Sequence, residues 1–317
     1  MPLTLSDIQA ARVRIAPHVK LTPVLTNDAL DAAAGAQLFF KCENLQAMGA
    51  FKARGAVNAV FSLSAMDAAR GVVTHSSGNH GAAVARAARL RGIPGFIVMP
   101  HNAPRTKVRN VESHGGQIVY CEPNLTAREA ACAKIAAETG AVLVHPFDDY
   151  AVMAGQGTAT LELLEQAGAL DLMLCPVGGG GLLCGTAVAA KGTQPGIRVI
   201  GVEPAAADDV AQSFRAKKPV SIAHANTIAD GLRTNVTGER NLPLILQHVD
   251  DIVTVSEEAI VAAMRTLWEN LKIVIEPSAA VPFAAIQSRA FDVSGKRIGI
   301  ILTGGNVDLD SLPWLKK

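Results

Sequence analysis

The sequence predicts an α/β protein built from mostly parallel β-sheets that are covered by helices on both faces. Short runs rich in β-branched residues alternate along the chain with alanine-rich stretches of helical character, and this alternation is typical of strand–helix–strand units. Leu172–Val177 is apolar almost without interruption, which indicates a strand buried on both faces of a sheet. No internal repeat and no low-complexity linker interrupts the pattern.

The expected elements follow one another along most of the chain. Strands are predicted where a short apolar run ends at turn residues, at Leu38–Glu43, Gly71–Ser76, Phe96–Met99, Gln117–Cys121, Val142–His145, Leu172–Val177, Val199–Glu203, Ile252–Val255 and Ile298–Thr303. Helices are predicted where alanine-rich segments lie between these strands, at Asn79–Arg91, Ala127–Thr139, Leu182–Lys191 and Glu257–Leu271.

Length and composition restrict the class of protein. The chain has 317 residues, of which 49% are hydrophobic and 18% are charged, which predicts a compact protein large enough for two lobes. The net charge of +1, without a long charged run, argues against nucleic acid or an anionic membrane as a partner. No apolar run reaches the ~18 residues of a membrane helix, and the first residues lack a secretion-signal pattern. We therefore expect a cytoplasmic protein with reduced, buried cysteines.

Four consecutive glycines, Gly178, Gly179, Gly180 and Gly181, lie between a predicted strand and a predicted helix. A backbone without Cβ atoms can turn its N–H groups toward an anion, and the helix N-terminus adds partial positive charge. The run therefore predicts a phosphate site, with a simple tight turn as the alternative. Because Leu183 occupies the sixth position, the run does not fit a dinucleotide fingerprint, and it does not fit a P-loop.

Lys52 follows a short strand and a glycine turn and stands at the start of a predicted helix. Alone, such a lysine is most simply a surface residue. The segment Thr303-Gly-Gly-Asn306 ends the last predicted strand and places a hydroxyl there. One lysine, one glycine cradle and one hydroxyl together suit a cofactor that carries an aldehyde, a phosphate and a ring nitrogen.

These motifs resemble those of fold-type II pyridoxal-phosphate (PLP) enzymes of the serine/threonine dehydratase and serine racemase family. The resemblance extends from the N-terminus to about Asp308. It implies the tryptophan-synthase β-like fold, with residues 1–70 and 149–317 as a large PLP-binding domain and residues 71–148 as a small domain. It also implies an active site in the cleft between the domains, and a homodimer.

The resemblance assigns the cofactor contacts. Lys52 would form the Schiff base with PLP, Asn79 would bond its phenolic oxygen, and Thr303 would face its ring nitrogen. A hydroxyl in this last position makes the ring a weaker electron sink than a carboxylate would. The other implied cofactor contacts are Phe51, the four glycines with Leu182, Gly231 over the ring, and Glu276.

Substrate contacts are implied in the loop Ser76-Ser77-Gly78-Asn79-His80. Ser76 and the loop backbone would hold the substrate carboxylate. Ser77 matches the second catalytic base of the racemase-like members, opposite Lys52, with an ordinary helix cap as its alternative. His80 has a packing role as its alternative. Arg128 matches an arginine that approaches the substrate, and a solvated helix position is its alternative.

The resemblance also implies a Mg²⁺ or Ca²⁺ site formed by Glu203, the carbonyl of Ala207, and Asp209. Carboxylates and carbonyls are hard oxygen ligands of the kind that these ions prefer. The alternative is that Asp208 or Asp209 caps the next helix. We find no spacing of His and Cys typical of zinc sites.

The expected activity is that of a carbon–nitrogen lyase that releases ammonia from a β-hydroxy-α-amino acid. Serine, threonine and 3-hydroxyaspartate all fit. Thr303, and Ala50 in a motif position where many members carry serine, favour 3-hydroxyaspartate. The alternatives are an amino-acid racemase that uses Lys52 and Ser77, and a non-catalytic ligand-binding protein on the same scaffold. The missing dinucleotide fingerprint disfavours a dehydrogenase.

Overall fold

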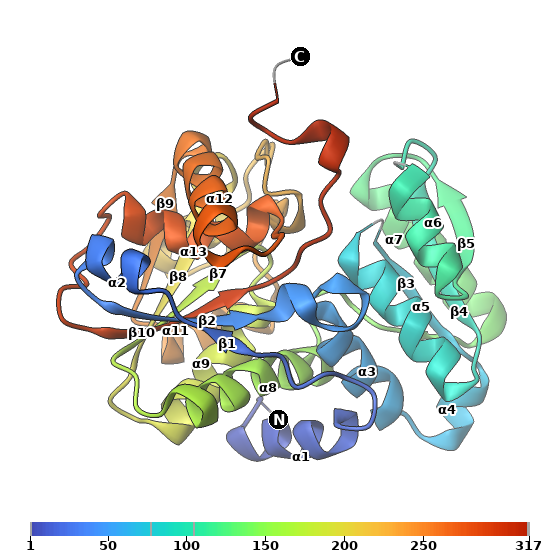
Figure 1. Ribbon diagram of the computed structural model, residues 1–317. Helices are drawn as coiled ribbons and strands as arrows, with labels where there is room; N and C mark the ends of the chain where they lie inside the picture. Colours follow the sequence, from blue (N-terminus) through green and yellow to red (C-terminus); the bar gives the residue numbers. More distant parts are fainter. Residues whose placement is uncertain (1, 77, 104, 316–317) are drawn as a thin grey trace.

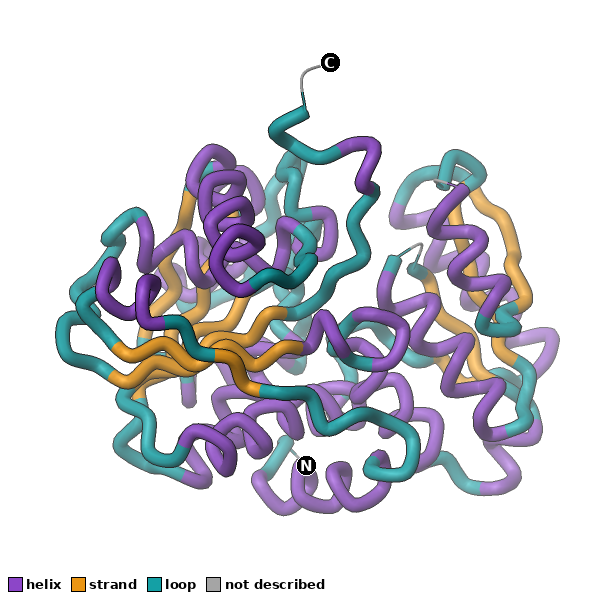
Figure 2. The backbone as a smooth tube through the Cα atoms, viewed as in Figure 1, coloured by secondary structure: helices purple, strands orange, loops and turns teal. Residues whose placement is uncertain are grey.

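The computed structural model describes residues 2–76, 78–103 and 105–315. Two β-sheets lie side by side, each with helices on both faces (Figure 1). Figure 2 shows the strands as two separate groups within a mostly helical surround. This arrangement confirms the predicted fold class. None of the helices in the described ranges is long and apolar enough to cross a membrane.

The larger sheet has six strands in the spatial order β1-β2-β10-β7-β8-β9. β1 pairs antiparallel with β2, and the other neighbouring strands pair in parallel. The strands are β1 (Val24–Leu25), β2 (Gln37–Cys42), β7 (Leu172–Pro176), β8 (Arg198–Pro204), β9 (Asp251–Val255) and β10 (Arg297–Leu302). The two-residue β1 was not predicted, because so short an edge strand leaves no periodic pattern.

Helices cover both faces of the larger sheet (Figure 1). Alternation along β7 explains why: Met173 and Cys175 pack into one core, and Leu172 and Leu174 pack into the other. One layer contains α1 (Leu5–Ile15), α8 (Tyr150–Ala167), α9 (Gly181–Thr193), α10 (Asp209–Ala216) and α11 (Asn241–His248), and the other contains α2 (Asp28–Ala34), α12 (Glu257–Leu271) and α13 (Pro277–Gln287).

The smaller sheet is parallel throughout, in the order β5-β4-β3-β6. Its strands are β3 (Val72–His75), β4 (Gly95–Pro100), β5 (Gln117–Cys121) and β6 (Val142–Leu143). Helices α3 (Lys52–Ser62) and α5 (Asn79–Arg91) share a core on one face, and α7 (Leu125–Thr139) covers the other. The short α4 (Ala65–Ala69) and α6 (Arg105–Ser113) complete this part. The exact domain boundaries stay a prediction.

Helix α3 lies between the two sheets, where it packs against α5 on one side and α8 on the other (Figure 1). The parallel strands β3, β7, β8 and β10 all end in loops that carry predicted functional motifs. In parallel α/β sheets, ligand sites lie beyond the carboxyl ends of the strands. The fold therefore places the motifs from distant parts of the sequence where they can form one site.

Candidate active site

Lys52 begins α3 directly after a turn that contacts the end of β10. Ala50 forms an antiparallel bridge with Gly304, and the Phe51 N–H donates to the Thr303 carbonyl at 2.9 Å. Two motifs that are about 250 positions apart in the sequence are therefore joined by backbone hydrogen bonds. The strand-end motif and the lysine motif form one wall of the site.

The environment of Lys52 favours reactivity. Its Nζ donates to the Pro146 carbonyl at 2.8 Å. Removal of the amine from water lowers the pKa of Lys52 to about 8, although the nearby Glu276 carboxylate acts in the opposite direction. A lysine with this pKa is partly deprotonated near neutral pH, as a nucleophile or general base must be.

The four glycines form the predicted turn between β7 and α9. Gly180 caps α9 with φ of 99°, a left-handed conformation that glycine adopts readily. A Cβ on Gly179 would lie 2.4 Å from the Phe147 ring, and one on Gly181 would lie 2.8 Å from the Phe147 carbonyl oxygen. Close packing against Phe147 therefore requires glycine at positions 179 and 181. The N-terminus of the 13-residue α9 offers backbone N–H groups and partial positive charge to a phosphate.

The segment 145–148 links Lys52 to the glycine turn, and sequence reasoning missed it. Pro146 accepts the hydrogen bond from Lys52, and Phe147 packs on the turn. The His145 Nδ1 accepts from the backbone N–H of Phe147 at 3.3 Å and so shapes the segment. Asn241, also missed, donates its Nδ2 to the Gly179 carbonyl at 2.5 Å. These contacts join distant positions, and the one local signal was a proline beyond a predicted strand.

Asn79, Glu276 and Asn306 form a hydrogen-bonded group beside Lys52. The Asn79 Nδ2 donates to the two Glu276 carboxylate oxygens at 3.0 and 3.2 Å. The Asn306 Nδ2 donates to the Asn79 Oδ1 at 2.9 Å. Burial raises the pKa of Glu276 to about 7, as does the Asp230 carboxylate, while the hydrogen bond from Asn79 opposes the rise. Sequence analysis predicted Asn79 and Glu276 as cofactor contacts and gave Asn306 no role.

Thr303 and Gly231 complete the part of the site formed by the larger sheet. The Thr303 Oγ1 is buried and has no hydrogen-bond partner within residues 2–76, 78–103 and 105–315. The Gly231 N–H donates to the Ser278 Oγ at 3.0 Å. A Cβ on Gly178 would lie 3.1 Å from the Leu232 Cα, so the turn that contains Gly231 lies against the glycine turn. Leu182 is buried in the core, which leaves its backbone N–H as the group that could contact a phosphate.

The predicted substrate loop lies at the N-terminus of α5. The Ser76 Oγ accepts from the Gly78 N–H at 3.2 Å. Ser77, the predicted second base, lies outside the described residues. His80 is buried, its Nε2 contacts the Val144 carbonyl at 3.1 Å, and burial keeps the pKa of its imidazole well below the usual value. These contacts favour the packing role for His80.

Arg128 is partly buried on α7, near the strand that leads into this loop. Burial lowers the pKa of His75, at the end of β3, while the charge of Glu129 opposes this shift and that of Arg128 adds to it. The Arg128 Nε is buried without a hydrogen-bond partner in the described part of the chain. The arginine is therefore partly buried and does not lie on a fully solvated helix face.

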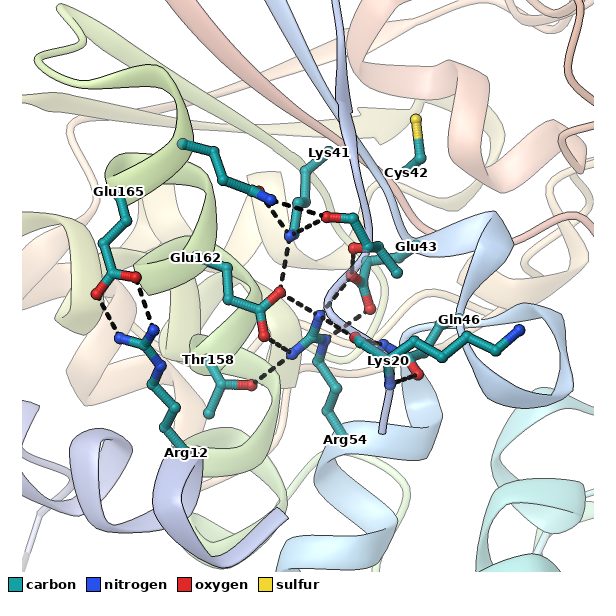
Figure 3. Close-up of polar contacts among 12 residues, drawn as sticks. Arg12, Lys20, Lys41, Cys42, Glu43, Gln46, Arg54, Thr158, Glu162 and Glu165 are labelled. Carbon is teal, nitrogen blue, oxygen red and sulfur yellow. Dashed lines mark hydrogen bonds and ion pairs between the residues drawn. The ribbon is translucent and has the colours of Figure 1, made fainter. Parts of the chain in front are cut away.

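A buried ion network fixes the first turn of α3 (Figure 3). Arg54 is fully buried and donates to Glu43 at 2.7 and 2.8 Å and to Glu162 at 2.7 Å. Lys41, also fully buried, lies 2.7 Å from Glu162. Although Arg54 follows Lys52 by two positions, its guanidinium is occupied by these carboxylates. Desolvation, and not this cation, explains the lowered pKa of Lys52.

The predicted metal ligands Glu203 and Asp209 are both buried. Glu203 accepts from the N–H groups of Val210 and Ala211 at 3.2 and 2.8 Å, so Glu203, rather than Asp208 or Asp209, caps α10. Burial raises the pKa of Glu203 to about 9 and that of Asp209 to about 7, because a buried carboxylate without a cation favours its neutral form.

Few side chains at this position could act as metal ligands. Among the described residues, no group of three or more His, Cys, Asp and Glu side chains is placed to hold a metal ion. The Asp209 Oδ2 is buried without a hydrogen-bond partner in the same ranges. Two carboxylates, one of them with an unpartnered oxygen, fit a hard cation that takes its other ligands from backbone carbonyls and water.

Comparison with known proteins identifies the family. A family model described as "Pyridoxal-phosphate dependent enzyme" matches residues 15–304. The chain belongs to this family. These matches establish that the protein is a PLP-dependent enzyme of the group that contains lyases and racemases, as the motifs predicted.

Relatives of this PLP-dependent enzyme carry two different activities in their names. The chain is 49% identical over 311 residues to the β-hydroxyaspartate dehydratase of Paracoccus denitrificans, with 98% of each chain covered. It is 50% identical over 311 residues to the serine racemase of Oryza sativa subsp. japonica, covering 96% of this chain and 91% of that protein. The solved structure of maize serine racemase has a TM-score of 0.96 and 47% identity, with 98% of this chain and 95% of that chain covered.

The residues present fit PLP. The cofactor has a phosphate for the α9 N-terminus, an aldehyde for Lys52, and a ring nitrogen for the buried Thr303 hydroxyl. Asn79 holds an NH₂ group beside Glu276 on the side of the smaller sheet. The cofactor roles of these individual residues stay predictions.

Proposed function

We propose that the protein is a PLP-dependent ammonia-lyase that acts on a β-hydroxy-α-amino acid, with 3-hydroxyaspartate as its preferred substrate. Overall, the Cα proton and the β-hydroxyl are lost as water, and hydrolysis of the unsaturated amine then releases a 2-oxo acid and ammonia. The buried Thr303 hydroxyl carries this proposal. Bound PLP would supply the electron sink for Cα deprotonation. The Thr303 hydroxyl, facing the ring nitrogen, would keep that sink weaker than a carboxylate would, which favours prompt loss of the β-hydroxyl.

In this proposal the chain's own residues divide the work. The Lys52 Nζ removes the proton from Cα, because its lowered pKa makes the neutral amine accessible near pH 7. The Ser76 loop at the α5 N-terminus binds the substrate carboxylate through backbone N–H groups. Arg128, whose Nε is buried without a hydrogen-bond partner in the described part of the chain, is the candidate partner of a second carboxylate, such as the one in 3-hydroxyaspartate. The similarity to a protein named β-hydroxyaspartate dehydratase supports the same substrate class.

An assay of ammonia and 2-oxo acid release from the purified, PLP-loaded protein tests this function. The panel contains both enantiomers of serine and threonine and the stereoisomers of 3-hydroxyaspartate. We expect the highest kcat/KM with one 3-hydroxyaspartate isomer. A protein that binds PLP but releases ammonia from none of these compounds would refute the lyase. A protein that binds no PLP would favour the non-catalytic scaffold.

Racemisation is the second candidate function, favoured by the equal similarity to proteins named serine racemase. A racemase needs a base on each face of Cα, and Ser77 is the sequence candidate opposite Lys52. We expect Ser77→Ala to spare elimination from an L-substrate. The same change should reduce racemisation and elimination from D-substrates by ~10²–10⁴-fold, the usual effect of losing a general base.

The Ser77 variant is measured in both assays, with Ser113→Ala, on the exposed end of α6, as the control. If both activities fall equally, Ser77 binds the carboxylate or supports the loop. If racemisation is undiminished, Ser77 has no part in proton transfer.

We also propose that Glu203 and Asp209 bind Mg²⁺ or Ca²⁺. An ion that binds only the folded state stabilises it by mass action, by about 2.7 kcal/mol at a hundredfold excess over Kd. A chelator should therefore lower the melting temperature, and added Mg²⁺ or Ca²⁺ should restore it. Asp209→Asn keeps the shape of the side chain and should abolish this metal response, as should Glu203→Ala. A response that persists in both variants places the ion elsewhere.

A further inference from the structure

Asn306 is the last residue of the strand-end motif and contacts three separate parts of the site. Its Nδ2 donates to the Asn79 Oδ1 at 2.9 Å and to the Met48 carbonyl at 2.9 Å. Its backbone N–H donates to the Glu276 Oε2 at 3.2 Å. One residue therefore connects the start of α5, the turn that leads to Lys52, and the start of α13.

These contacts determine which way the Asn79 amide faces. A backbone carbonyl only accepts hydrogen bonds, and the NH₂ group of an asparagine only donates them. The Met48 carbonyl therefore fixes the Asn306 NH₂, and that NH₂ selects the Asn79 oxygen, which leaves the Asn79 NH₂ facing Glu276. If the Asn79 amide were flipped, its oxygen would lie against the Glu276 carboxylate and its NH₂ group against the Asn306 NH₂ group. Because an NH₂ group has two hydrogens, Asn79 in the observed orientation can donate to Glu276 and to a ligand together.

The turn before Lys52 is built around the Asn306 side chain. Gly49 has φ of 74°, and a Cβ on it would lie 2.7 Å from the Asn306 Oδ1. Met48 has φ of 55°, a left-handed conformation that is strained for a residue with a side chain. The hydrogen bond from Asn306 to the Met48 carbonyl holds this turn in place. Lys52 follows Gly49 by three positions, so the position of Asn306 also affects that of the lysine.

We propose that Asn306 is a positioning residue for the cofactor. It orients the Asn79 NH₂ toward the phenolic oxygen of PLP and holds the turn from which Lys52 projects. This inference rests on the proposed role of Asn79 in cofactor binding. It does not depend on whether the enzyme is a lyase or a racemase.

The test measures PLP affinity by titrating the apo-protein, so it requires no substrate. Asn306→Ala and Asn306→Asp remove the donor, and Asp also places an acceptor against the Asn79 oxygen. We expect each to weaken PLP binding by about 10-fold or more, as the loss of one or two net hydrogen bonds implies. The pH at which the visible absorption of bound PLP changes should also rise, because a donated hydrogen bond stabilises the phenolate.

Asn235→Asp is the matched control. Asn235 also donates its Nδ2 to two backbone carbonyls, those of Ile222 and Ala223 at 3.0 and 3.1 Å, and lies in an exposed loop. It should leave the PLP affinity and the absorption profile unchanged. Thermal melting of each apo-protein establishes that the variants are folded, and Asn306→Ser serves as a milder change if one of them is not.

A double-mutant cycle with Asn79→Ala distinguishes positioning from general support. If Asn306 acts through Asn79, Asn306→Ala should lower PLP affinity much less in the Asn79→Ala background than in the wild type. Equal effects in both backgrounds, or wild-type affinity in the Asn306 variants, would overturn the inference. Normal PLP binding by a wild type that releases no ammonia would instead contradict the proposed function and leave this inference standing.

Discussion

Lys52→Ala is expected to abolish ammonia release and the covalent attachment of PLP while the protein stays folded. No other lysine among residues 2–76, 78–103 and 105–315 combines contact with the 145–148 segment, a pKa lowered to about 8, and a place beside Glu276. With that pKa, about a tenth of the amines are neutral at pH 7, against far fewer for an ordinary lysine. In the proposed mechanism the same amine would serve as nucleophile toward the aldehyde and as base toward Cα.

The lowered pKa also predicts the stability of this variant. In the unfolded chain Lys52 titrates near ~10.4, whereas in the folded protein its pKa is about 8. The folded state therefore carries a cost that is fully present below pH 8 and disappears as the pH rises through the unfolded pKa. Because alanine removes this cost, the apo form of Lys52→Ala should melt no more than a few degrees below the wild type at pH 7.

Borohydride reduction of the wild type followed by peptide mapping locates the cofactor. We expect the label on the peptide that contains Lys52 and no label in the variant. Lys134→Ala is the control, because Lys134 is 75% exposed on α7 and should leave labelling and activity unchanged. A label on a different lysine would show that the site has been assigned to the wrong residue.

Much of the fold could be predicted because its signals are local. Helices α5 (Asn79–Arg91) and α12 (Glu257–Leu271) begin and end at the predicted residues, since strong terminal signals such as the left-handed Gly92 after α5 bound them. Helix α7 begins two positions earlier than predicted, because Asn124 caps it. The pairing of β2 with β10 is long-range, and no local pattern specifies it.

The residues of the candidate site also divide into those with local sequence signals and those that depend on long-range contacts. Lys52, the glycine turn and Thr303 belong to short motifs, so the sequence identified them. Phe147, Asn241 and Asn306 act through contacts with residues far along the chain, and only the folded structure brings these partners together. The direction of the Arg54 side chain was equally unpredictable, because its carboxylate partners lie on a different strand end and a different helix.

Arg54→Met is expected to destabilise the protein by about 3–5 kcal/mol, because it removes one partner of a buried ion network. Arg54 is the main cation between Glu43 and Glu162, and all three side chains are buried. Burial alone would raise the pKa of Glu43, but Arg54 outweighs it and lowers the pKa below its usual range. Without the guanidinium, Glu43 becomes a buried carboxylate whose remaining nearby cation, Lys41, is paired with Glu162. The loss is a large share of the ~5–15 kcal/mol that stabilises a typical domain.

The pH dependence separates this mechanism from a simple packing defect. In the wild type, Glu43 stabilises the folded state above its unfolded pKa, and this contribution is lost as the pH falls through the lower folded pKa. In Arg54→Met we expect the folded pKa of Glu43 to exceed the unfolded one, so acidification relieves the buried charge. The difference in unfolding free energy between wild type and variant should therefore shrink as the pH falls from 7 toward 5. A packing defect would give a difference independent of pH.

Arg12→Met provides the matched control for the Arg54 variant. Arg12 pairs with Glu165 at the outer side of the same helix α8 (Figure 3), where the two side chains are 39% and 58% exposed. An exposed pair of this kind contributes about 0–1 kcal/mol, so urea unfolding of the apo-proteins should separate the two variants clearly. Equal effects would mean that the buried network does not stabilise the fold. A large effect confined to Arg54→Met would show that the buried network, and not ion pairing on α8 in general, stabilises the fold.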